Sequence, residues 1–131
     1  MALTMDDPYA PLSENHLLAH LRPAEIALLQ PIFQVWRGEA GSVLYEPGDP
    51  VESTYFPCGA SLASFRVVLP DGESVEATLV GREGAVGGIV SHGRLPAYTR
   101  AVVQHPGAFI RVETAKLEDA KLKSITLRHI F

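Results

Sequence analysis

The chain has 131 residues, a formal net charge of -4, and a composition that is 47% hydrophobic and 20% charged. This length is enough for one domain that buries roughly two thirds of its unfolded surface, and the composition excludes an intrinsically disordered chain. The 11 basic residues form no Lys or Arg run, which argues against direct nucleic-acid binding, and a single cysteine, Cys58, excludes an internal disulfide.

The N-terminal segment is expected to contain neither a secretory signal nor a membrane span. Asp6 and Asp7 stand where a secretory signal would place basic residues, and no apolar run approaches the roughly 18 residues of a membrane span. We therefore expect a cytoplasmic protein without a membrane partner. Residues 1–12 contain two prolines and no periodicity, which predicts a loose lead-in, and residues 13–131 are expected to form the folded domain.

Two short helices are predicted before the first strand. Ser13 or Asn15 is suited to cap the first, because either side chain accepts from unpaired N–H groups of a first turn. Its apolar stripe comprises Leu17, Leu18 and Leu21. Pro23 suits the first position of the second helix, and Pro31 interrupts it. The apolar positions of this second helix are Ile26, Leu28 and Leu29.

From Phe33 to Val112 the pattern changes to brief apolar or alternating runs separated by Gly, Pro and Asp. Such a pattern is typical of an antiparallel sandwich or barrel. The predicted strands cover residues 34–37, 42–45, 53–56, 62–69, 75–80, 99–105 and 109–112. Seven or eight strands fit a double-sheet jelly roll.

Pro47, Gly48 and Asp49 predict a tight turn, because proline presets φ and glycine accepts the positive φ that follows. A strong hairpin signal is the turn at Asp71 and Gly72. Alternating apolar residues flank this turn and are expected to meet in the core, namely Ala63, Phe65, Val67 and Leu69 on one side and Val75, Ala77 and Leu79 on the other. Arg66 and Glu76 should then face away from the core, where an exposed pair contributes at most about 1 kcal/mol.

After Glu113 the apolar spacing becomes helical again, with Thr114 as the expected cap. The pattern continues to the apolar pair Ile130 and Phe131. An apolar end on a helix needs a partner, so we expect it to dock on a second copy of the chain or to continue into a longer helix.

The order of these motifs resembles the Crp/Fnr superfamily of regulators over roughly residues 15–131. The segments that carry the resemblance are Leu44 to Asp49, Tyr55 to Pro57, Asp71 with Gly72 and Val75 to Val80, Gly81 to Gly88, and Arg100 to Val103. It implies a mainly β double-stranded β-helix (jelly roll) barrel, with short flanking N-terminal helices and a C-terminal helix. It also implies that a small molecule is sensed in the roll, that the chain forms a homodimer through a long C-terminal helix, and that DNA binds through a helix-turn-helix. That DNA-binding module is not among these residues.

The resemblance implies a ligand site at a glycine-rich turn and at the start of the next strand. Its residues here are Val86, Gly87, Gly88, Ile89, Thr99, Arg100 and Ala101. In nucleotide-binding members the turn cradles a cyclic phosphate, a glutamate holds the ribose, and an arginine contacts the phosphate. Gly88 stands at the position of the glutamate, Thr99 at that of the arginine, and Arg100 one place later.

A shift of one residue along a strand moves a side chain to the opposite face. We therefore expect that cAMP is not the effector, and favour a different small-molecule effector or a pocket that has lost its ligand. Arg100 is then either an anion-binding residue, which would require a bulge, or an exposed strand charge. Gly84, Gly87 and Gly88 are either phosphate-cradle residues or glycines that permit close packing.

The sequence leaves two alternative functions, a cupin-like metalloenzyme and a ligand-free interaction domain. Jelly rolls also form cupin-like metalloenzymes, but His92 and His105 are 13 positions apart and neither has a neighbouring histidine. His16 and His20 are four apart on a predicted helix, without an evident third ligand. Cys58 is expected to be a structural thiol. We expect no enzyme, no metal and no cofactor, and a ligand-free interaction domain is the third hypothesis.

Overall fold

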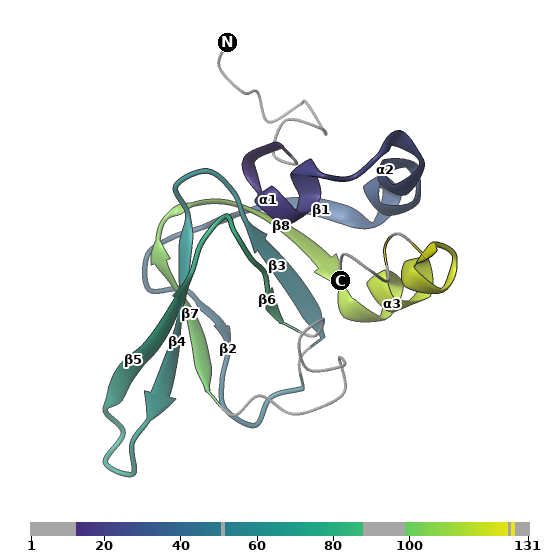
Figure 1. Cartoon of the computed structure of the whole chain (residues 1–131). Coiled ribbons are helices and arrows are strands. Elements are labelled where there is room, and N and C mark those ends of the chain that lie inside the picture. Colours follow the sequence, from purple (N-terminus) through teal and green to yellow (C-terminus); the bar gives the residue numbers. More distant parts are fainter. Residues whose placement is uncertain (1–12, 51, 88–98, 126, 128–131) are drawn as a thin grey trace.

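The computed structural model describes residues 13–50, 52–87, 99–125 and 127. These form a roll of two antiparallel sheets with helices at one end (Figure 1). The elements, in order, are α1 (His16–Ala19), α2 (Pro23–Leu29), η2 (Gln30–Ile32), β1 (Phe33–Gly38), β2 (Val43–Tyr45), β3 (Ser53–Pro57), β4 (Leu62–Val68), β5 (Ser74–Val80), β6 (Val86–Gly87), β7 (Arg100–His105), β8 (Gly107–Glu113) and α3 (Thr114–Leu122). The predicted mainly β fold is confirmed, and all seven predicted strands match within two residues at each end, while β6 was not predicted.

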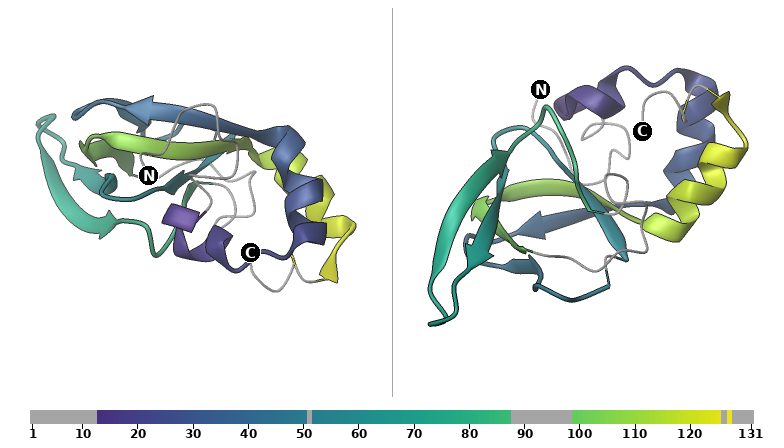
Figure 2. Two further views of the ribbon diagram at one scale, coloured as in Figure 1. Left: turned by 90° about the horizontal axis from the view of Figure 1, so that it is seen from above. Right: turned by 60° about the horizontal axis from the view of Figure 1, so that its bottom comes forward.

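The first sheet has the order β1-β8-β3-β6, and the second has the order β2-β7-β4-β5. Figure 2 shows α2 and α3 side by side at one end of the roll, while the β4–β5 hairpin projects at the far side. None of the helices in the described ranges has the length and apolar character that crossing a lipid bilayer requires.

Two buried clusters fill the molecule. One lies between the helices and the first sheet, and comprises Leu18, Leu21, Leu29, Phe56, Cys58, Ile110, Val112, Leu117, Ala120 and Leu127. The other lies inside the roll, and comprises Tyr55, Ala63, Val86, Ala101, Val103 and Phe109. Because neighbouring residues of β3 and β8 point to opposite faces, both strands contribute to both clusters.

Asn15 anchors the N-terminal helices to the roll. Its Oδ1 accepts from the backbone N–H groups of Leu17 (3.0 Å) and Leu18 (3.3 Å), so the predicted cap is confirmed. Its Nδ2 donates to the carbonyl oxygens of Pro57 (2.7 Å) and Gly84 (3.0 Å). The side chain is fully buried, so one amide satisfies a helix start, a strand end and a turn.

The expectation that the apolar faces of β4 and β5 meet in the core along their whole length is wrong. A β-bulge between Phe65 and Arg66 shifts the pairing, so that Thr78 is opposite Phe65 and Leu79 is opposite Ser64. Leu79 is therefore on the face opposite to the predicted one and is 48% exposed. The tip of the hairpin extends beyond the roll, and three further apolar side chains there are exposed: Val67, Leu69 and Val75.

Arg66 and Glu76 are paired in register, as predicted, but Arg66 Nε donates to Ser74 Oγ at 3.0 Å. The expected cap of the last helix also differs. Glu113 is the N-cap of α3, and Thr114 is the first helical residue, whose buried Oγ1 lies 3.1 Å from Thr54 Oγ1. Ile130 and Phe131 lie outside the described residues.

Candidate functional site

The interior of the roll is lined by aromatic rings from five strands. Trp36 of β1 meets Tyr55 of β3 and Phe109 of β8 with ring centroids 5.5 and 5.6 Å apart. Tyr45 of β2 and Phe65 of β4 are 6.5 Å apart. Offset and edge-to-face pairs at these separations are favourable. Because side chains alternate between the two faces of each strand, these five aromatic residues all lie on the face that points into the roll.

Gly87 allows β6 to lie against β3. Its φ is +125°, and a Cβ built on it would lie 2.4 Å from the carbonyl oxygen of Ser53. Val86 beside it is fully buried and is paired with Tyr55. A glycine is therefore required at position 87 by close packing. Gly88 and Ile89, the next residues of the predicted site, lie outside the described residues.

The turn that leads into β6 is closed by its own hydrogen bonds. The N–H of Gly84 donates to the carbonyl oxygen of Gly81 at 3.1 Å, and the N–H of Gly81 donates to Glu83 Oε1 at 2.9 Å. Backbone hydrogen bonds of this kind hold the pKa of Glu83 below its usual range, because they stabilise the carboxylate. His16 N–H donates to the Arg82 carbonyl oxygen at 2.7 Å, so this turn and α1 are joined directly.

The first residues of β7 separate into two faces. Ala101 is fully buried in the interior cluster, and Thr99, which precedes the strand, is half-buried. Pairing with β4 is regular from Arg100 to Val103, so Arg100 lies on the face opposite to Ala101. Its guanidinium donates to Glu46 through Nε to Oε1 and through Nη2 to Oε2, the latter at 3.3 Å. The anion-binding role of Arg100 stays a prediction, and this guanidinium has a carboxylate partner.

Glu46 begins the turn between β2 and β3. Its carbonyl oxygen accepts from Asp49 N–H at 3.1 Å, and its own N–H donates to Asp49 Oδ2 at 3.0 Å. Gly48 takes a φ of +88° in this turn, as the Pro-Gly-Asp pattern predicts. Two hydrogen bonds thus join Glu46 to Asp49 across the turn, and the ion pair with Arg100 ties the turn to β7.

A cavity of about 160 Å³ lies beside this turn, and we call it the β2–β3 cavity. Its lining comprises Leu44, Tyr45, Asp49, Pro50, Glu52, Ser53 and Tyr55. Among the described lining residues, Asp49 and Glu52 are the charged ones, and both are acidic. Burial raises the pKa of Tyr45 to about 12, so its phenol is neutral at physiological pH. Sequence reasoning missed this lining, although Pro47, Gly48 and Asp49 had marked the turn.

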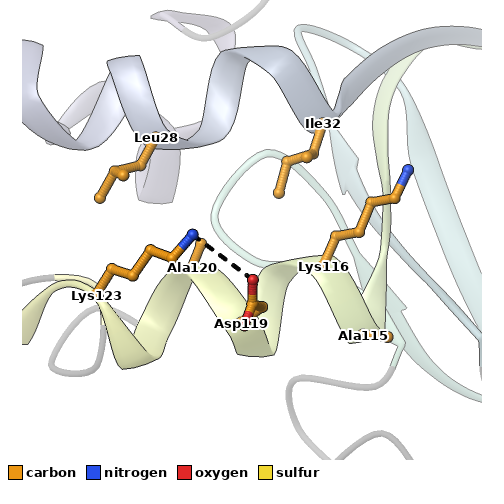
Figure 3. Close-up of a pocket in the computed structure, with 7 residues that line it drawn as sticks. All are labelled: Leu28, Ile32, Ala115, Lys116, Asp119, Ala120 and Lys123. Atoms are coloured by element: carbon orange, nitrogen blue, oxygen red, sulfur yellow. Dashed lines mark ion pairs between the residues drawn. The ribbon is translucent and has the colours of Figure 1, made fainter.

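A second depression of about 570 Å³ separates α2 and α3 (Figure 3). It is lined by Leu28, Ile32, Ala115, Lys116, Asp119, Ala120 and Lys123. Lys123 Nζ lies 3.7 Å from Asp119 Oδ2, and both side chains are well exposed. It is an open surface groove outside the roll.

The described residues bring together no group of three or more His, Cys, Asp or Glu side chains of the kind that holds a metal ion. His92 and His129 lie outside them. Cys58 is buried, and its Sγ is 3.4 Å from the Phe56 carbonyl oxygen. Burial raises the pKa of this thiol to about 12.

No family model and no curated protein matches this sequence. Solved structures do match. The N-terminal domain of a transcriptional regulator from Streptomyces coelicolor A3(2) is 18% identical, with a TM-score of 0.69 over 91% of this chain and 82% of that one. The sensor domain of the transcriptional regulator DNR from Pseudomonas aeruginosa is 16% identical, with a TM-score of 0.71 over 92% and 80%.

The regulatory subunit of a cAMP-independent protein kinase A from Trypanosoma cruzi, bound to guanosine, is 14% identical. Its TM-score is 0.69 over 84% of this chain and 39% of that one. At these identities the likeness establishes the fold. The chain therefore has the β-roll fold of cyclic-nucleotide-binding domains, as its motif order predicted.

Proposed function

We propose that this chain is the effector-sensing domain of a transcriptional regulator and that its effector is not a cyclic nucleotide. The β-roll and its likeness to a regulator's N-terminal domain and to a regulator's sensor domain support the first part. DNA binding would then come from a helix-turn-helix module separate from these residues.

The observation that carries the second part is the placement of Arg100. A cyclic phosphate needs a cation in the roll, whereas Arg100 lies on the opposite face to Ala101 and its guanidinium contacts both oxygens of Glu46. Breaking an ion pair of this exposure costs up to about 1 kcal/mol. Asp49 and Glu52 line the nearby cavity, and each would repel a phosphate 4 Å away by about 1 kcal/mol in water.

Ligand binding tests this proposal. Thermal melts are measured with cAMP, cGMP, adenosine, guanosine and a panel of small metabolites, because a ligand at about 100 times its dissociation constant adds about 2.7 kcal/mol of stability. We expect cAMP and cGMP to leave the midpoint unchanged in the natural protein and in Arg100→Ala, while another compound raises it. A rise with cAMP that Arg100→Ala abolishes would overturn the second part. If no compound raises the midpoint, a ligand-free interaction domain is the better description.

A homodimer through the C-terminal segment completes the proposal. Leu122 and Ile125 are exposed at the end of α3 and just after it, although both are large and apolar. Ser124 Oγ accepts from Leu127 N–H at 3.2 Å and so starts a further helical turn there. Sedimentation equilibrium should show a dimer that Leu122→Gln with Ile125→Gln weakens. Val75→Gln, an exposed apolar position on the hairpin, is the matched control, and equal weakening by it would contradict this interface.

A further inference from the structure

Among the described residues that line the β2–β3 cavity, the charged side chains have one sign. Of its lining residues, Asp49 and Glu52 carry charge, and both are carboxylates on the segment between β2 and β3. Arg100, the basic residue tied to this segment, is matched by Glu46. A cavity lined in this way attracts cations and repels anions.

The volume of the cavity sets the size of its occupant. An apolar cavity of about 150 Å³ is known to hold benzene. The β2–β3 cavity, at about 160 Å³, therefore accommodates a single ring or an aliphatic group of similar size. Two carboxylates, the Ser53 hydroxyl and two phenols make its lining more polar than that of a hydrocarbon site.

Two tyrosines give the cavity walls that suit a cation. An aromatic face attracts an ammonium or amidinium group within about 6 Å of its centroid. The ring of Tyr55 already has the Arg111 guanidinium 6.0 Å from its centroid, so Tyr45 is the ring available to a guest. The Tyr45 phenol is protonated at physiological pH, so it is able to donate a hydrogen bond.

We infer that the β2–β3 cavity binds a small organic cation, an amine or amidine on a group of about one ring, between the carboxylates of Asp49 and Glu52 and the ring of Tyr45. This assignment rests on the proposed function, since it names the chemical class of the effector. The Asp49 carboxylate accepts from the Glu46 N–H, and Glu46 is paired with Arg100, so this carboxylate is held in place.

Three probes of one shape and different charge test the inference. Benzamidine is a cation, benzamide is neutral and benzoate is an anion, and their affinities are measured by NMR titration of the full chain at low and moderate salt. We expect benzamidine to bind about tenfold more tightly than benzamide, with the ratio falling as salt screens the carboxylates. Benzoate should give no saturable shift. Equal affinities for benzamidine and benzamide, tighter binding of benzoate, or no binding of any probe would overturn the inference.

Variants then locate the site. Asp49→Asn removes one carboxylate charge and retains an oxygen acceptor for the Glu46 N–H. Glu52→Gln removes the other carboxylate charge independently. Each is expected to weaken benzamidine binding about two- to fivefold, the range of single exposed charge pairs. Glu73→Gln, on the exposed turn of the hairpin, is the control that should leave affinity unchanged. Unchanged affinity in both cavity variants, or an equal loss in the control, would contradict the assignment.

The two proposals fail in different ways. If a nucleoside or another metabolite raises the melting midpoint while benzamidine does not bind, the cation assignment is wrong and the sensing function stands. If neither the metabolite panel nor the three probes bind, both are wrong. If cAMP binds through Arg100, the proposed exclusion of cyclic nucleotides fails.

Discussion

Gly87 gives the sharpest test of how the roll is closed. Its φ of +125° is strained for any residue with a Cβ, which costs about 1–3 kcal/mol. A Cβ there would also lie 2.4 Å from the Ser53 carbonyl oxygen and 3.0 Å from the Thr54 Cα. These are backbone atoms of β3, so β6 must move away, and overpacking of this kind costs about 1–3 kcal/mol. Gly87→Ala is therefore expected to lose about 3 kcal/mol or more.

Gly48→Ala is the matched control. Gly48 also has a positive φ, of +88°, but an added Cβ would meet no atom within 4 Å. Gly48→Ala should lower the free energy of unfolding only by the strain of a positive φ, about 1–2 kcal/mol. For a domain of this length each kcal/mol lowers the melting midpoint by roughly 3–5 °C. Urea denaturation and thermal melts should thus separate the two variants by at least about 1–2 kcal/mol. Equal losses in the two variants would refute the argument that β6 depends on close approach to β3.

Three further predictions concern buried polar groups. Asn15→Ala should lower the free energy of unfolding by about 2–4 kcal/mol in urea denaturation. Asn15→Asp should lower it at least as much, because a carboxylate cannot donate to the Pro57 carbonyl oxygen. An Asn15→Asp variant with unchanged stability would contradict this. Thr54→Val and Thr114→Val should each lower the free energy of unfolding by about 1–2 kcal/mol, because each leaves the other hydroxyl without its partner. The double variant should lose less than the sum of the two, and strict additivity would refute the coupling. Because burial raises the pKa of Cys58 from 9.0 to about 12, the stability from its neutral thiol is complete below pH 9 and is lost as the pH rises toward 12. Labelling of Cys58 by a disulfide reagent at pH 8 should follow the unfolding rate, and rapid labelling would show an accessible thiol.

The strands were predictable because they end at turn-forming residues, namely Pro, Gly and Asp. Pro47 to Asp49 and Asp71 with Gly72 set two of the turns, and apolar alternation between them set the strands. Asn15 could be predicted as a helix cap from its residue type. Its bonds to Pro57 and Gly84 could not, because they join segments that are 42 and 69 residues apart.

Alternation could not predict which side chains of β5 face the core, because one bulged residue moves the following side chains to the opposite face of the sheet. Nothing in the local sequence marks that bulge. The lining of the β2–β3 cavity was missed for a related reason. Asp49 and Glu52 read as ordinary loop acids, and only the fold of the segment brings them beside Tyr45 and Tyr55. The partner of Arg100, Glu46, is 54 positions away in the sequence.

The two buried clusters share β3 and β8, and in β3 this has a mechanical consequence. Tyr55 points into the roll and Phe56 into the layer beneath the helices, and they are joined by a single planar peptide. Movement of the β3 backbone at Tyr55 would therefore carry Phe56 with it, and Phe56 lies in one buried cluster with Leu117 and Leu127. The wall of the β2–β3 cavity is thus linked to the layer beneath α3 through adjacent residues of one strand.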